Sequence, residues 1–135
     1  MYSWKRNNRV FSYEDFQDAA KACAVVCREL GVPISMEANS AEPPIFTKDT
    51  IRFNGLGHDS ADTFLVKRVE AEEENGCATR GHPYDTCVAV CLVILRNKLN
   101  FTIHSDDEDE SRGHTGFEEA EGHIADIIGK ETEGA

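Results

Sequence analysis

Residues 83–98 read PYDTCVAVCLVILRNK, and the conformation of this stretch decides the fold. Its apolar part, residues 87–95, shows no period, so the pattern alone allows either a buried strand or a buried helix. The flanks favour a helix, because Pro83 suits the first helical position and Asp85 suits the positive N-terminal end. Two basic residues follow near the negative C-terminal end. We therefore predict a central helix over 83–98, covered by a sheet and by another helix.

An amphipathic helix is expected before this stretch, over residues 12–30. Ser12 can cap its free backbone N–H groups, with Asp15 three residues further on, and Gly31 and Pro33 end it. The apolar residues at helical spacing that form its buried stripe are Phe16, Ala20, Cys23, Cys27 and Leu30. A last helix is expected from Thr115 to Gly129, and its buried face consists of Phe117, Ala120, Ile124, Ile127 and Ile128.

Strands are predicted where apolar residues alternate with polar ones. Residues 50–54 and 63–68 form an antiparallel hairpin through a turn at 55–60, and residues 100–104 form a third strand. A fourth, short strand is a candidate at 33–37. Acidic loops are expected at 70–76 and 105–113.

The resulting order, α-(β)-β-β-α-β-α, predicts an α+β two-layer sandwich with three helices and one small antiparallel sheet of about three or four strands. The chain has 135 residues, a length that fits one domain. We expect an N-terminal arm or edge strand at 1–11, a single domain at 12–130 and a frayed tail at 131–135.

The charge of the chain is negative and unevenly placed. Asp and Glu number 25 against 14 Lys and Arg, and residues 105–135 hold eleven acids against two basic residues. Such a surface repels phosphates, so a nucleic-acid partner is not expected. No apolar run is long enough to span a membrane, and no apolar segment follows the basic residues 1–9 as in a secretory signal. The expected location is the cytoplasm, without a membrane partner.

The five cysteines predict free thiols in a reducing compartment, because their number is odd and four of them lie in apolar stretches. Cys23 and Cys27, like Cys87 and Cys91, are four residues apart and therefore share a helix face. If the two helices pack together, four sulfurs could approach one point as in a zinc site. The apolar surroundings favour small core residues instead, and no metal or cofactor is assigned.

A second group of residues could support catalysis by a thiol or a metal. Cys77, His82 and Asp85 lie within nine residues near the start of the central helix, and His58 and Asp59 lie in the hairpin turn. A helix N-terminus and a nearby histidine can activate a thiol. The sequence shows neither an orienting group nor an oxyanion site, so a small thiol- or metal-dependent enzyme stays the alternative, and no catalytic residue is assigned.

The most distinctive feature is a run of five acids: Asp106, Asp107, Glu108, Asp109 and Glu110. The run partly matches a calcium-binding loop, but Arg112 stands where that loop requires glycine. It can serve solubility alone, or it can bind a protein with a basic surface. These five residues are the candidate binding site.

Two stretches carry a resemblance to a known group of proteins. Residues 51–64 read IRFNGLGHDSADTF, and residues 77–88 read CATRGHPYDTCV. Together they resemble small, uncharacterised proteins of tailed bacteriophages and prophages, with a Phe-Asn-Gly turn and a Cys-x-Thr segment leading into Pro-Tyr-Asp. The likeness spans residues 50–105 and implies a phage origin and the host cytoplasm, but no activity. Asn54 and Gly55 would take positive φ, and the helix start at 83–85 could hydrogen-bond to the hairpin loop.

The leading hypothesis is therefore a phage accessory protein without catalysis that binds a basic host or phage protein through its acidic surface. The thiol- or metal-dependent enzyme is one alternative. A minor virion or assembly component is another, and it would show itself by forming homo-oligomers.

Overall fold

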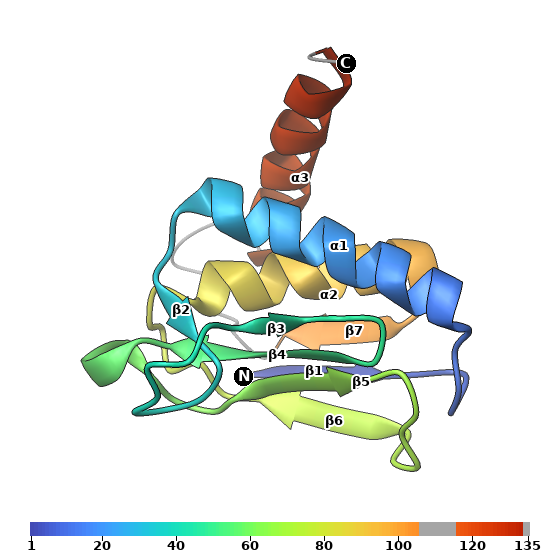
Figure 1. The fold of residues 1–135 in the computed structure, drawn as a ribbon, viewed down its shortest axis with the longest axis horizontal. Helices are drawn as coiled ribbons and strands as arrows, with labels where there is room; N and C mark the ends of the chain where they lie inside the picture. Colours follow the sequence, from blue (N-terminus) through green and yellow to red (C-terminus); the bar gives the residue numbers. More distant parts are fainter. Residues whose placement is uncertain (106–115, 134–135) are drawn as a thin grey trace.

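The computed structural model describes residues 1–105 and 116–133 of the chain. Helices lie on one side and strands on the other, with α1 and α2 above the strands (Figure 1). The helices are α1 (Tyr13–Leu30), α2 (Asp85–Leu99), α3 (Gly116–Glu133) and the short 3-10 helix η1 (Gly57–Asp59). The predicted α+β class is confirmed.

The strands form two small antiparallel sheets, whereas the sequence predicted one. They are β1 (Tyr2–Lys5), β2 (Ile34–Ser35), β3 (Ile45–Phe46), β4 (Thr50–Gly55), β5 (Phe64–Lys67), β6 (Glu74–Cys77) and β7 (Thr102–Ser105). One sheet has the order β6-β1-β7, and in the other β4 pairs with β2, β3 and β5. The predicted hairpin is β4–β5, with Thr50 opposite Lys67 and Phe53 opposite Phe64. The rings of Trp4 and Phe64, 5.0 Å apart, join the two sheets.

Helix α1 begins and ends at the predicted residues. The Ser12 hydroxyl accepts a hydrogen bond from the Asp15 N–H at 3.1 Å, and Gly31 ends the helix in the left-handed region at φ 70°. Phe16, Ala20 and both cysteines of the predicted stripe are buried. Local signals were therefore sufficient for this element.

Helix α2 confirms the helical interpretation of the central apolar stretch. Every residue from Cys87 to Leu95 is buried, because α1, α3 and the strands surround the helix. The helix begins at Asp85 with Tyr84 at the N-cap, so Pro83 lies before the first helical position that we predicted for it. Asn100 ends the helix at φ 58°, in the region that asparagine tolerates better than most residues.

Three strands differ from the prediction: β3 and β6 arise where no strand was expected, and β1 takes a different place in its sheet. Tyr2–Lys5, expected as an arm or an edge strand, is the central strand of its sheet, with Tyr2 opposite both Cys77 and Ser105. Glu74–Cys77, mostly assigned to an acidic loop, pairs along β1. In β1 the buried Tyr2 and Trp4 alternate with Ser3 and Lys5, a strand pattern that the nearby basic charges obscured.

Arg6, one of the basic N-terminal residues, is buried instead of facing solvent. Its guanidinium donates hydrogen bonds to the backbone oxygens of Asn8 and Lys67 at 2.8 Å and of Arg68 at 3.0 Å. It also lies 4.9 Å from the ring centroid of Phe11. Burial lowers the pKa of Arg6, and the negative charge of Glu70 opposes this effect. The residue therefore links the end of β1 to the end of β5.

Helix α3 continues past Gly129, where we expected it to end, and reaches Glu133. Gly129 has no left-handed φ, so it does not form the expected C-cap, and the frayed tail expected from residue 131 is helical up to Glu133. None of the described helices combines the length and the apolar character needed to cross a membrane.

Candidate functional site

Helix α3 docks on the rest of the protein through its first half. The Phe117 ring lies 5.7 Å from the ring of Tyr2, and Ala120 and Ile124 are buried. Ile127 is partly buried, but Ile128, expected on the same face, is 44% exposed. The second half of α3 extends beyond α1 (Figure 1). Because fewer neighbours surround that half, the predicted buried stripe stops short of Ile128.

The exposed acids among the described side chains of α3 are Glu118, Glu119, Glu121 and Asp126. Glu118, Glu119 and Asp126 lie on the face away from the stripe, whereas Glu121 lies at the border of the stripe, near α2. Glu121 accepts a hydrogen bond from the Arg96 guanidinium at 2.5 Å, which fixes the helix to α2. Glu118 and Glu119 lie in the first turn, where the helix dipole favours negative charge. Docking of the apolar stripe therefore leaves α3 with an acidic outer face.

The predicted site, residues 106–110, lies outside the described residues, as does most of the partial calcium-loop match. The sequence places this run between Ser105, the last residue of β7, and Gly116, the first of α3. Five acids therefore precede the acidic helix in the chain, separated from it by residues 111–115.

The two motifs of the phage resemblance meet in space at the start of α2. The Tyr84 hydroxyl donates to the backbone oxygen of Asp62, in the loop of the β4–β5 hairpin, at 2.7 Å. The Asp85 carboxylate accepts hydrogen bonds from the hydroxyls of Tyr2, at 2.7 Å, and Thr79. The expected contact between the helix start and the hairpin loop is confirmed. These hydrogen bonds give both motifs a structural role at the start of α2.

Asn54 and Gly55 have structural roles that differ from the predicted one. Neither has a positive φ, and in this loop Gly57 takes the left-handed conformation at φ 59°. The Asn54 amide donates to the backbone oxygen of Ala61 at 2.8 Å and to the Thr63 hydroxyl at 3.1 Å. Its Oδ1 accepts from the Ala61 N–H at 3.0 Å, so this buried side chain holds the loop closed.

The geometry disfavours Cys77 as a catalytic nucleophile. Its side chain is buried and donates to the backbone oxygen of Asp62 at 3.4 Å. Burial, followed by the negative charge of Asp62, raises the pKa of Cys77 to about 12. His82 lies 3.8 Å from the Asp59 carboxylate, and in the described part of the chain it forms no hydrogen bond with Cys77. Among the described residues, Cys77 therefore has no hydrogen-bonded histidine of the kind that activates the thiol in a thiol enzyme.

Alkylation tests this assignment. We expect iodoacetamide at pH 8 to modify Cys77 far more slowly in the folded protein than in urea, because the raised pKa cuts the thiolate fraction by about a thousandfold. Peptide mapping after timed quenching measures the rate. Rapid modification of Cys77 in the folded protein would contradict the assignment and revive the thiol-enzyme alternative.

The other four cysteines come together between α1 and α2, as their spacing allowed. The sulfurs of Cys27 and Cys91 are 3.6 Å apart, Cys27 also hydrogen-bonds with Cys87, and Cys91 with Cys23. Among residues 1–105 and 116–133, no three or more His, Cys, Asp or Glu side chains are placed to hold a metal ion. The two helices therefore meet through a cysteine cluster, defined here as Cys23, Cys27, Cys87 and Cys91.

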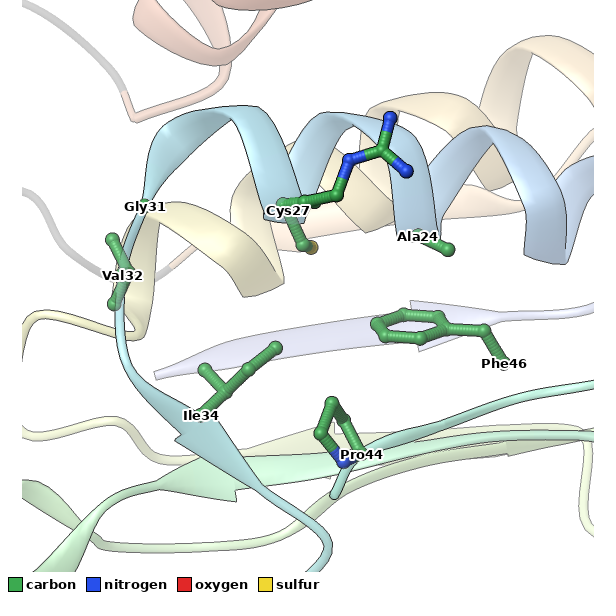
Figure 2. A pocket seen from close by; sticks show the side chains of 8 residues that line it. Ala24, Cys27, Gly31, Val32, Ile34, Pro44 and Phe46 are labelled. Carbon is green, nitrogen blue, oxygen red and sulfur yellow. The ribbon is translucent and has the colours of Figure 1, made fainter.

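A cavity of about 380 Å³ opens beside this cluster. Figure 2 shows Ala24 and Cys27 pointing from α1 towards Ile34, Pro44 and Phe46 below. The remaining lining residues are Arg28, Gly31 and Val32. The lining is mostly apolar. The sequence could not predict this cavity, because its walls come from segments that only the folded chain brings together: the end of α1, β2 and β3.

Comparison of the chain with protein-family models, curated proteins and solved structures finds no match. The candidate sites are therefore the acidic outer face of α3 and the cysteine cluster with its cavity.

Proposed function

We propose that the protein binds a basic protein through an acidic surface formed by α3 and residues 106–110, and that it acts without catalysis. The observation that supports this proposal is the orientation of α3. The first half of its apolar stripe packs against the core of the protein, while four acids in its described part are exposed. A dense negative surface speeds encounter with a positive partner and disfavours negatively charged ones.

The resemblance to phage proteins suggests the kind of partner. In that setting the protein would act in the host cytoplasm on a basic host or phage protein. The alternative of a virion or assembly component is supported by one observation: within the described residues, β6 and β7 each pair on one side only, and unpaired strand edges favour self-association.

Neutralisation of the acids tests the proposal. The tagged protein is used to capture partners from bacterial lysate at low and moderate salt, beside a variant with residues 106–110 changed to Asn and Gln. A second variant carries Glu118→Gln, Glu119→Gln and Asp126→Asn on α3. We expect each variant to lower the affinity for the captured partner by about tenfold or more, mainly through slower association.

A matched control separates a specific surface from total charge. Glu72→Gln, Glu73→Gln and Glu74→Gln remove three exposed acids around the start of β6, the same charge change as on α3. This variant should bind the partner as the wild type does. Equal losses in the control and the α3 variant, or no loss in either acidic-surface variant, would contradict the proposal. Light scattering shows separately whether the protein self-associates.

A further inference from the structure

The cysteine cluster places thiols where two helices pack. Cys23 and Cys27 share one face of α1, and Cys87 and Cys91 share one face of α2, because four residues complete about one helical turn. The sulfurs of Cys27 and Cys91 are 3.6 Å apart. A disulfide needs about 2.05 Å, so a small movement of side chains on adjacent helices would join them.

Only one member of the cluster lines the cavity. Cys27 is 3% exposed, whereas Cys23, Cys87 and Cys91 are fully buried. It takes part in the lining of the 380 Å³ cavity together with apolar side chains of β2 and β3 (Figure 2). A small uncharged molecule can enter such a space, while a large or charged reagent is disfavoured. Access therefore distinguishes Cys27 from the other cysteines of the cluster.

The neighbouring thiols also distinguish Cys27 electrostatically. Hydrogen bonds from Cys87 and Cys91 lower the pKa of Cys27, and burial opposes this effect. The pKa values of Cys87 and Cys91 rise, because their thiols act as donors and are buried. Arg28 adds a cationic side chain at the lining. The pKa shifts therefore favour the thiolate on Cys27, the cysteine that the cavity reaches, and the thiolate is the nucleophilic form.

We propose that Cys27 is a peroxide-reactive thiol and that Cys91 is its resolving partner. The Cys27 thiolate attacks one oxygen of hydrogen peroxide, the O–O bond breaks, and the leaving hydroxide takes up from solvent the proton that Cys27 released on ionising, which gives water. Cys27 is then a sulfenic acid. The Cys91 sulfur attacks the Cys27 sulfur, the S–O bond breaks, and a second water leaves. The two thiols supply two electrons, and the products are a Cys27–Cys91 disulfide and two waters.

The experiment treats the folded, fully reduced protein with hydrogen peroxide and measures intact mass and a non-reduced peptide map. We expect a mass loss of about 2 Da, reversed by dithiothreitol, and a cross-linked peptide that contains Cys27 and Cys91. Cys77 should stay reduced over the same period, oxidising at least about tenfold more slowly. This measurement needs no variant, so it decides the proposal even if substitutions disturb folding.

Variants then assign the two roles. Cys91→Ser should leave a sulfenic acid on Cys27 that dimedone traps, and Cys27→Ser should abolish both the cross-link and the trapping. Cys77→Ser is the control outside the cluster and should behave as the wild type. The proposal is overturned if Cys27 oxidises no faster than Cys77, or if the cross-link joins other cysteines. Circular dichroism confirms that each variant is folded.

Discussion

Replacing Gly55 by alanine is expected to lower the free energy of unfolding by about 3 kcal/mol or more. An added Cβ would lie 1.8 Å from the backbone oxygen of Asp59 and 2.9 Å from the Tyr84 ring. The added methyl group would clash with backbone on one side and with a buried ring on the other. Neither can move aside easily, so the hairpin loop or α2 would have to shift. Urea denaturation followed by circular dichroism measures the change.

Gly57→Ala is the matched control two residues further along the loop. A Cβ there meets nothing within 4 Å, and only the left-handed φ of 59° opposes it. We expect a loss of about 1 kcal/mol from that strain. If the two variants were equally stable, close packing of the hairpin loop against the start of α2 would not be the reason for glycine at position 55.

The second large effect is expected at Arg6. Arg6→Met keeps much of the apolar stem but removes the donors that satisfy the backbone oxygens of Asn8, Lys67 and Arg68. A partly buried backbone oxygen that loses its hydrogen-bond donor destabilises the folded state by more than the hydrogen bond had stabilised it. We therefore expect the free energy of unfolding to fall by about 3 kcal/mol. Arg6→Lys should restore little, because an ammonium group cannot reproduce the planar fork.

Arg9→Met provides the control, because it removes the same charge from an exposed side chain three residues away. This change should alter the free energy of unfolding by about 0.5 kcal/mol or less. Comparable losses for Arg6→Met and Arg9→Met would mean that net charge, and not the buried guanidinium, stabilises the junction of the two sheets.

The close packing at Gly55 indicates that the two sequence motifs have structural roles. The Phe-Asn-Gly and Pro-Tyr-Asp segments stood out in the sequence, and the structure shows Gly55 packed close to the Tyr84 ring, with Tyr84 hydrogen-bonded to Asp62 in the same hairpin loop. Substitutions there should act on stability first. Effects on binding without loss of stability are expected on α3, and redox effects are expected in the cysteine cluster.

The candidate sites were predictable only in part. The negative charge of residues 105–135 and the buried face of α3 at Phe117 and Ala120 were both predictable from the sequence. The exposure of Ile128 was not, because it depends on which part of α3 docks on the rest of the protein. The spacing of Cys23/Cys27 and Cys87/Cys91 showed that each pair shares a helix face. It could not show that Cys27 alone meets a cavity, because that cavity is completed by β2 and β3.

Local signals in the sequence were sufficient to predict the three helices, apart from the end of α3, and the hairpin. Ser12, the apolar stripe and Gly31 define α1 through contacts within a few residues, and alternation defines β4 and β5. The central place of β1 and the existence of β6 depend on tertiary contacts, because a four-residue strand gains its hydrogen bonds from partners far along the chain: Tyr2 pairs with Cys77 and Ser105. Local periodicity carries no information about such partners, and the same reason hid the burial of Arg6.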